Sequence, residues 1–256
     1  MTRIILSGAD GRMGHVIADL AAADAEAEIV AGVDIAGKSS GSFPVYQTFE
    51  ELAANLKGGA DVIVDFSSPK AFDTMMDYSV KEGVPAVVCT TGLSEEQIER
   101  LNEESKKVAV LRSANMSLGI NLLLKVVKEA AGKLASAGFD IEIVEAHHNQ
   151  KKDAPSGTAL ALADSINEGQ GSAYTYIYDR HDRMEKRNQK EIGISSVRGG
   201  TIPGIHKVIF AGQDEVIEFN HTAYSRSIFG KGALAAAKYL AGKPAGFYSM
   251  ADVIGS

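Results

Sequence analysis

The chain has 256 residues, which is enough for two modest domains or one large one. Its hydrophobic fraction of 45% and charged fraction of 23% are typical of a globular protein, and its net charge of −7 argues against nucleic acid as the main partner. The single cysteine, Cys89, excludes an intrachain disulfide. The sequence shows neither a signal peptide nor an apolar run long enough for a membrane span, so we expect a cytoplasmic protein.

Short apolar, β-branched runs alternate with helix-like stretches in the first half of the chain. These runs predict strands at 3–7, 28–34, 61–67, 85–91 and 108–113. They are apolar at successive positions, as expected for strands covered by helices on both faces. Between them, Thr48 with Glu51 and Ser94 with Gln97 have the spacing of capping boxes, and Ser68 stands before a proline at a helix start. The pattern predicts an α/β fold with a Rossmann-like, doubly wound parallel sheet.

The character of the sequence changes after residue 117. Helices are predicted at 117–137, 156–167 and 228–241, and strands at 140–145, 191–198, 205–211 and 215–221. The segment 169–189 is polar. We therefore expect a dinucleotide-binding domain at 1–117, with 227–256 packing back on it, and a smaller α+β domain with a mixed sheet at 118–226.

A glycine-rich loop follows the first predicted strand. Its glycines, Gly8, Gly11 and Gly14, permit a tight turn, and the helix that the loop opens would present free N–H groups to a pyrophosphate. Asp34 lies 20 residues after Gly14, at the end of the second predicted strand, where a carboxylate can accept the ribose hydroxyls of an adenosine. A purely structural turn is the alternative, but it has no need of the acidic residue. The combination predicts a dinucleotide site.

Asp34 also bears on the choice of cofactor. A carboxylate repels the 2′-phosphate of NADPH, and the next residues, Ile35 and Ala36, have no guanidinium to bind it. Arg12 and Lys38 are the nearest basic candidates, although Lys38 can equally be a solvated surface lysine. We expect NADH to be preferred over NADPH.

The most unusual stretch of the chain runs from Glu145 to Thr158 and reads Glu-Ala-His-His-Asn-Gln-Lys-Lys-Asp-Ala-Pro-Ser-Gly-Thr. Its first histidine, His147, is a candidate proton donor because imidazoles exchange protons near neutral pH. The helix start after Pro155 offers backbone N–H groups and a threonine hydroxyl to a carboxylate. The alternatives are a partly buried structural histidine, surface lysines and ordinary helix capping. The combination favours a small dicarboxylate substrate, and we expect no metal site.

These segments resemble the 4-hydroxy-tetrahydrodipicolinate reductase (dihydrodipicolinate reductase) family of lysine and diaminopimelate biosynthesis. The resemblance covers nearly the whole chain, and the histidine segment is its most specific part. Further matching segments are Asp65-Phe-Ser67, Thr90-Thr-Gly92, Ser113-Ala-Asn-Met116 and Val197-Arg-Gly-Gly-Thr-Ile-Pro-Gly-Ile-His206. The sequence departs from the family pattern at Cys89, where glycine is expected, and at Met116, where an aromatic residue is common.

The resemblance implies a reduction that yields tetrahydrodipicolinate from a cyclic hydroxy precursor, with release of water. It implies that His147 and Lys151 form the acid/base pair and that His148, Gly157 and Thr158 bind the substrate. It also implies a homotetramer built by the second domain's sheet. The residues implied to contact the cofactor are Gly8, Ala9, Asp10, Gly11, Arg12, Met13, Asp34, Cys89, Thr90, Thr91, Ser113, Ala114, Asn115 and Met116.

Two other functions are compatible with the first domain. One is a nicotinamide-dependent amino-acid dehydrogenase that acts on aspartate or homoserine, which has no reason to carry His-His-x-x-Lys before Pro-Ser-Gly-Thr. The other is a dinucleotide-sensing protein without turnover, which needs the glycine loop and Asp34 but no proton donor.

Overall fold

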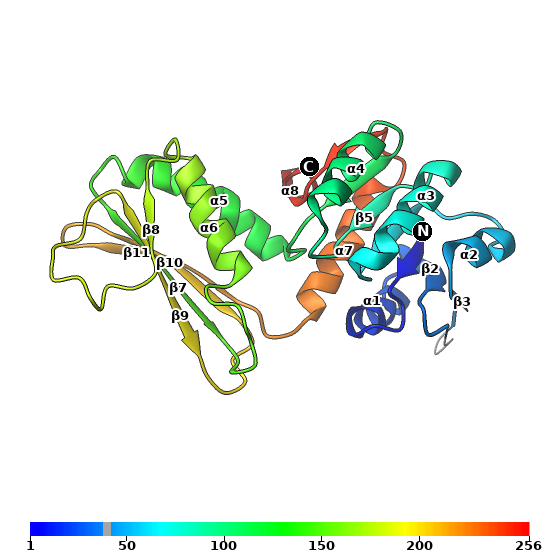
Figure 1. Ribbon diagram of the computed structural model, residues 1–256, viewed down its shortest axis with the longest axis horizontal. Helices are drawn as coiled ribbons and strands as arrows, with labels where there is room; N and C mark the ends of the chain where they lie inside the picture. Colours follow the sequence, from blue (N-terminus) through cyan, green and yellow to red (C-terminus); the bar gives the residue numbers. More distant parts are fainter. Residues whose placement is uncertain (38–41, 256) are drawn as a thin grey trace. The chain divides into compact units, whose positions relative to one another are not determined.

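The computed structural model describes residues 1–37 and 42–255. The chain folds into two compact units, one formed by Met1–Leu118 with the chain from Arg226 onward and the other by Gly119–Ser225 (Figure 1). Over the described residues, no helix combines the length and the apolar character that crossing a membrane requires.

The first unit is built on a seven-stranded sheet in the order β12-β6-β5-β4-β1-β2-β3, with every neighbouring pair parallel. This order contains the 3-2-1-4-5-6 arrangement of doubly wound dinucleotide-binding folds. The predicted Rossmann-like fold is therefore confirmed. The strands are β1 (Thr2–Ser7), β2 (Ala27–Val33), β3 (Val45–Tyr46), β4 (Val62–Asp65), β5 (Ala86–Val88), β6 (Ala109–Arg112) and β12 (Gly246–Tyr248).

Helices cover both faces of this sheet, which explains why its strands are apolar at successive positions. One face packs against α1 (Arg12–Ala22), α7 (Ser227–Leu240) and α8 (Met250–Gly255). The other packs against α2 (Phe49–Asn55), α3 (Phe72–Glu82) and α4 (Glu95–Glu104), and a short 3₁₀ helix, η1 (Pro69–Ala71), precedes α3. The C-terminal helix α7 thus completes the core of the first unit.

The predicted helix starts differ in how they are built. Ser94 and Gln97 form a complete capping box at α4. The expectation of a second box at α2 is wrong: the Thr48 hydroxyl accepts the Glu51 N–H, but the Glu51 carboxylate bonds to the backbone of Gln47. The carboxylate reaches one residue further back, so only one half of the reciprocal pair forms.

The second unit packs two helices on a five-stranded mixed sheet in the order β11-β10-β7-β9-β8. The pairs β10–β11 and β10–β7 are antiparallel, whereas β7–β9 and β8–β9 are parallel. This confirms the predicted α+β unit with a mixed sheet. Its elements are α5 (Leu118–Leu134), β7 (Asp140–His147), α6 (Gly157–Glu168), β8 (Thr175–Ile177), β9 (Glu191–Arg198), β10 (Ile205–Ala211) and β11 (Val216–Thr222).

The two faces of this second sheet have different surroundings. Side chains such as Ile143 and Phe210 are fully buried against α5 and α6. The alternate positions form what we call the outer sheet face. On the paired strands β7 and β10 it carries Glu142, Val144, Ala146, Ile205, Lys207 and Ile209.

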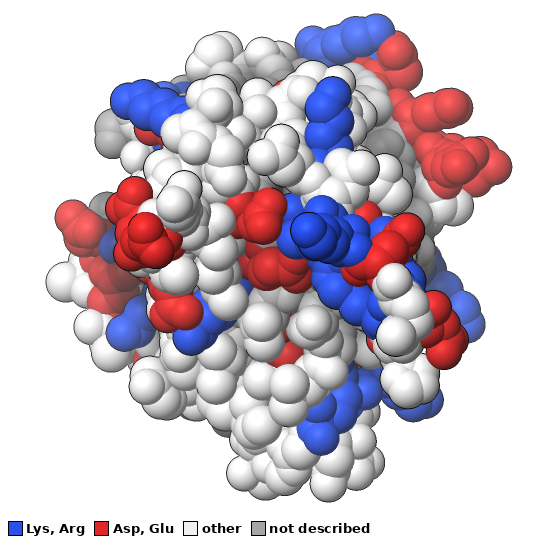
Figure 2. Space-filling model, turned by 90° about the vertical axis from the view of Figure 1, so that its left-hand side faces the viewer, with Lys and Arg blue, Asp and Glu red and all other residues white. Residues whose placement is uncertain are grey.

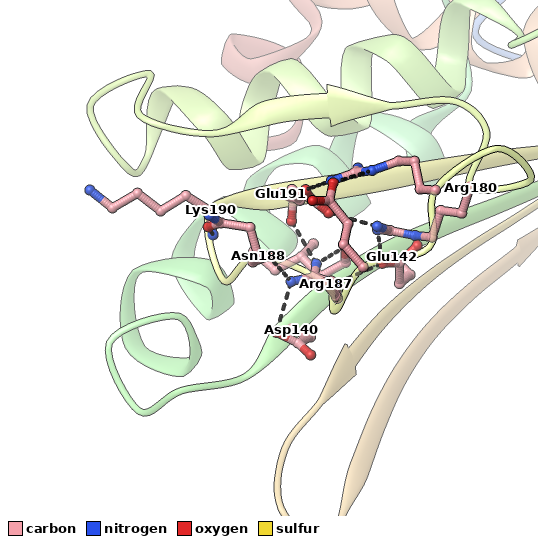
Figure 3. A network of polar contacts seen from close by, with 10 residues as sticks. Asp140, Glu142, Arg180, Arg187, Asn188, Lys190 and Glu191 are labelled. Atoms are coloured by element: carbon pink, nitrogen blue, oxygen red, sulfur yellow. Dashed lines mark hydrogen bonds and ion pairs between the residues drawn. The ribbon is translucent and has the colours of Figure 1, made fainter.

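Part of the polar segment before β9 is held to the sheet by arginines (Figure 3). Arg180 binds Glu142 and Glu191, with N···O distances of 2.8 and 2.6 Å. Arg187 donates to Glu142 and Asp140, at 2.9 and 2.8 Å. The network therefore connects the segment to the first residues of β7 and β9.

Candidate active site

The glycine loop has a backbone that side chains would obstruct. Gly8 has a φ of +79°, and a Cβ there would lie 2.6 Å from the Phe66 carbonyl oxygen. At Gly14, a Cβ would lie 2.3 Å from the carbonyl oxygen of Ala9. Gly11 is the N-cap of α1 and, as a glycine, has no side chain with which to cap this helix start. A helix start of this kind, after a glycine loop, is a typical anion-binding element.

Asp34 is fixed beside this loop, directly after β2. One carboxylate oxygen accepts the Asp10 N–H at 3.2 Å, and the other accepts the Ala36 N–H at 3.1 Å. The structure therefore places Asp34, the residue predicted to bind the ribose, beside the loop predicted to bind the phosphates. Arg12 is exposed at the first position of α1, and Lys38 lies outside the described residues.

Two further predicted segments lie at the ends of β5 and β6. Cys89 and Thr90 are buried and Thr91 is exposed. Burial, and then the charge of Asp65, raise the pKa of the Cys89 thiol, so it stays protonated and neutral. The Thr90 hydroxyl is buried and has no hydrogen-bond partner among the described residues. This leaves it able to bond to a bound molecule.

The segment Ser113–Met116 forms a turn after β6. The Ser113 hydroxyl contacts the Asn115 carbonyl oxygen at 2.8 Å and the Asn115 nitrogen at 3.2 Å. Ala114 is exposed and Met116 is buried. A Cβ at Gly232 in α7 would lie only 1.6 Å from the Met116 carbonyl oxygen. Gly232, which the sequence did not single out, therefore allows α7 to pack against this turn.

In the second unit, His147 is the last residue of β7 and is held by a carboxylate from its own strand. Its Nδ1 lies 2.6 Å from Oε2 of Glu145, whose side chain is fully buried. Arg198 of β9 binds both oxygens of that carboxylate at 2.7 Å. Burial raises the pKa of Glu145, but hydrogen bonds from Arg198, His147, Ser196 and Ser156 lower it to about 2. Glu145 is therefore a buried, ionised and fully hydrogen-bonded group.

The start of α6 joins the same group of residues. The N–H of Ser156 donates to Oε1 of Glu145 at 3.0 Å, and its hydroxyl caps α6 by accepting the Ala159 N–H at 3.2 Å. The hydroxyl also contacts Nε2 of the buried His206 at 2.9 Å. Burial, and then the neighbouring His147, lower the pKa of His206 to about 4, so this histidine is neutral at physiological pH.

The remaining predicted residues lie in the turn after β7 and in the first turn of α6. The Lys151 N–H donates to the His148 carbonyl at 3.1 Å, and the Lys151 ammonium pairs with Asp153 at 2.8 Å. That pairing lowers the pKa of Asp153. Gly157 and Thr158 are the first two residues of α6. His147 and this helix start are therefore linked through Glu145.

The sequence assigns no role to Glu145, Arg198 or His206, whereas Ser156 is one of the two residues expected to cap the helix start, and it does so. Glu145 could have been found as an acidic residue two positions before His147 on the same strand. Arg198 lies 53 residues from Glu145, and nothing in the local sequence indicates that they pair.

The comparisons with known proteins agree over the full chain. Residues 2–116 match the family described as dihydrodipicolinate reductase, N-terminus, and residues 119–254 match its C-terminus. The chain is 51% identical to 4-hydroxy-tetrahydrodipicolinate reductase of Caldanaerobacter subterraneus subsp. tengcongensis, over 99% of this chain and 98% of that protein. It is 46% identical to the enzyme of the same name from Clostridium novyi, over 100% and 99% of the two chains.

A solved structure is also similar. Dipicolinate-bound dihydrodipicolinate reductase from Paenisporosarcina sp. TG-14 superposes with a TM-score of 0.81 at 25% identity, covering 97% of each chain. The family matches, the sequence identities and the shared fold point the same way. The chain belongs to the dihydrodipicolinate reductase family.

Proposed function

We propose that this chain reduces 4-hydroxy-tetrahydrodipicolinate to tetrahydrodipicolinate, with release of water, in lysine and diaminopimelate biosynthesis. The observation that carries the proposal is the link between His147 and the start of α6 through Glu145. It connects a proton-transfer group to a carboxylate-binding helix start, in a chain that belongs to this family. An amino-acid dehydrogenase has no need of this linked pair.

The proposed substrate-binding residues lie at the start of α6 and in the turn after β7, and they have different roles. Gly157 and Thr158 begin α6, whose first N–H groups favour an anion, and they bind one substrate carboxylate. His148 contacts the substrate. Lys151 supplies a positive charge that favours negative charge developing on the substrate ring. His147 and Lys151 form the acid/base pair.

The first unit fits a nicotinamide dinucleotide. Gly8 and Gly14 keep the loop backbone free of side chains, and the start of α1, where the N-cap is a glycine, receives the pyrophosphate. When bound, the nicotinamide supplies the hydride for the reduction. The residues from Gly8 to Met13 hold the phosphates, and Cys89, Thr90, Thr91 and Ser113–Met116 line the nicotinamide end. Cys89 contributes as a small neutral side chain there.

We propose NADH as the preferred cofactor because of Asp34. Its two carboxylate oxygens bond to the loop backbone, which fixes the negative charge where the adenosine ribose binds. A charge held in place by two N–H groups repels a 2′-phosphate more effectively than a mobile surface carboxylate does.

We also propose a homotetramer that assembles through the outer sheet face. Val144, Ala146, Ile205 and Ile209 give this face an apolar strip, and Lys207 pairs with Glu218 beside it. On the side of the second unit seen in Figure 2, acidic and basic side chains are mixed across the middle of the view, with mostly uncharged side chains below them. An apolar strip with a charged pair beside it suits association with another copy of the chain.

The reaction is tested with the purified chain, the cyclic precursor and NADH. We expect precursor-dependent loss of NADH absorbance and formation of tetrahydrodipicolinate. His147→Gln should lower the rate by about 10²–10⁴-fold, because general acid catalysis contributes that much. His181→Gln is the matched control, since the His181 side chain is 83% exposed.

Two outcomes would overturn parts of this proposal. If the wild-type protein oxidises neither NADH nor NADPH in the presence of the precursor, the assigned reaction is wrong. If the wild type is active and His147→Gln matches it, His147 has no part in proton transfer.

A further inference from the structure

Glu145 has a role in the site that goes beyond the acid/base pair. We propose that Glu145 is a positioning residue that fixes a proton on Nδ1 of His147, so that Nε2 is the atom that exchanges a proton with the substrate. The inference rests on the proposed function for the identity of the substrate. The position of the proton on the imidazole follows from the described contacts alone.

The first step is the charge of Glu145. Its two oxygens receive the guanidinium of Arg198 in a two-point contact and the N–H of Ser156. These donors hold the carboxylate ionised, with a pKa of about 2, although the side chain is fully buried. An ionised carboxylate is only a hydrogen-bond acceptor.

The second step concerns the imidazole. Nδ1 of His147 lies 2.6 Å from Oε2 of Glu145, a distance that requires a proton between them. Since Glu145 carries none, Nδ1 must be the donor. Neutral His147 therefore has its proton on Nδ1 and a free lone pair on Nε2.

The third step is the space around Nε2. A Cβ at Gly204 would lie 3.3 Å from this atom, which is shorter than most contacts that Cβ atoms make in proteins. Because residue 204 is a glycine, no Cβ occupies that position. The ring of His206 lies edge-on to that of His147, with centroids 5.1 Å apart, and His206 is neutral at physiological pH. Nε2 is thus neither blocked by a side chain at position 204 nor faced by a second charge from His206.

The same carboxylate ties the substrate-binding elements to His147. Oε1 accepts the N–H of Ser156, the N-cap of α6, at 3.0 Å. Arg198 also donates to the Asp153 carbonyl at 2.6 Å, and Asp153 pairs with Lys151. Glu145 and Arg198 therefore set the position of His147, the lysine turn and the carboxylate-binding helix start relative to one another.

The proton count follows directly. The charged imidazolium carries protons on both nitrogens, with the Nδ1 proton donated to Glu145. When Nε2 gives its proton to the substrate, His147 returns to the neutral Nδ1–H form and Glu145 remains ionised. The carboxylate accepts the Nδ1 proton both before and after the transfer, so only the Nε2 proton moves.

Glu145→Gln tests this assignment because the amide must choose an orientation. If its NH₂ group replaced Oε1, it would face two donors, Ser156 N–H and Arg198. If it replaces Oε2, it faces one Arg198 donor and Nδ1 of His147. The Ser196 hydroxyl, which also bonds to Glu145, can either donate or accept and so opposes neither orientation. The second orientation is less costly, and it makes the amide donate to Nδ1, which forces the proton of His147 onto Nε2.

Two measurements test the assignment. The first is ¹⁵N NMR of the protein with ¹⁵N-labelled histidine, in which His147→Gln identifies the signal of His147. The second is steady-state kinetics. We expect the Nδ1–H tautomer in the wild type and the Nε2–H tautomer in Glu145→Gln. The variant's kcat should fall by about 10²-fold or more, as expected when general acid catalysis is lost, with a smaller change in KM. Glu145→Asp, which keeps the charge, should restore the Nδ1–H tautomer and part of kcat.

Glu142→Gln is the matched control. Glu142 lies on the same strand but on the outer sheet face, and it is also paired with arginines. It should leave the His147 tautomer and kcat unchanged. An Nδ1–H tautomer in Glu145→Gln, or a kcat equal to that of the wild type, would overturn the inference. The NMR result needs no substrate, so it separates failure of this inference from failure of the proposed reaction.

Discussion

At the scale of single residues, the sequence located the site but not its connections. The segment from Glu145 to Thr158 drew attention because histidine, lysine and a helix start are crowded together. The structure adds that Glu145 is the acceptor for His147, Ser156 and Arg198. Two of these contacts are short-range and could be expected from the strand and the N-cap. The contact with Arg198 depends on the pairing of β7 with β9, which places His147 opposite Arg198. No local sequence pattern indicates this pairing.

Asp34 gives a prediction at this scale. Asp34→Ala removes the negative charge beside the glycine loop, so the ratio of kcat/KM for NADPH to that for NADH should rise by about tenfold or more. The hydrogen bonds from Asp10 and Ala36 are lost as well, which should lower activity with both cofactors. The ratio is measured with purified enzyme at fixed ionic strength.

Asp34→Asn separates the two effects, because an amide keeps one acceptor for the backbone but has no charge. It should shift the ratio as Asp34→Ala does while retaining more activity. A ratio that stays the same in both variants would remove Asp34 from cofactor discrimination.

At the scale of elements, the sequence predicted the helices and strands that have a capping residue or a long apolar pattern of their own. Strands β9 and β10 begin and end where the apolar pattern does, and α4 and α6 begin directly after the serines that cap them. The short strands β3, β8 and β12 were not predicted. Each has two or three residues and is defined by its pairing with a longer neighbour, and such a strand leaves too brief a pattern to detect.

The two serine caps provide a matched prediction. Ser156 caps α6 through Ala159, at 3.2 Å, and Ser94 caps α4 through Gln97, at 3.3 Å. Either serine replaced by alanine should lower the free energy of unfolding by about 1 kcal/mol, as measured by urea titration. Only Ser156→Ala should also raise KM for the dicarboxylate, because its hydroxyl orders the turn that binds a substrate carboxylate and contacts His206.

The comparison has a clear negative outcome. An unchanged KM in Ser156→Ala, or an equal rise in Ser94→Ala, would show that the α6 start has no special part in substrate binding.

At the scale of the whole molecule, the fold class was predictable and the long-range pairing was not. Alternating strands and helices indicate a parallel sheet, but the strand order and the addition of β12 after β6 depend on contacts between distant segments. The polar segment before β9 shows the same limit. Its arginines look like solvated charges in the sequence, whereas Arg187 bonds to Asp140 and Glu142, more than 40 residues away (Figure 3).

The proposed tetramer gives the last prediction. Ile209 lies on the outer sheet face, and its cross-strand neighbours there are Glu142 and Glu218. Both glutamates are already paired, with Arg180 and Arg187 and with Lys207, but Ile209 is only half-buried, so a lysine here can extend its ammonium into solvent in an isolated subunit. Buried in a contact between copies of the chain, however, its ammonium would lose solvation that the apolar strip cannot replace. Ile209→Lys should thus keep its far-ultraviolet circular dichroism but sediment as a smaller species than a tetrameric wild type.

Gln213→Lys adds the same charge in the turn between β10 and β11, at an exposed position off the sheet face, and should remain tetrameric. If the wild type sediments as a monomer, the tetramer itself is wrong. If Ile209→Lys stays tetrameric, the copies associate through another surface. Because the carboxylate network around Glu145 lies on the helix-covered face of the same strand, a dissociated variant that keeps the Nδ1–H tautomer of His147 would show that the positioning role belongs to one subunit alone.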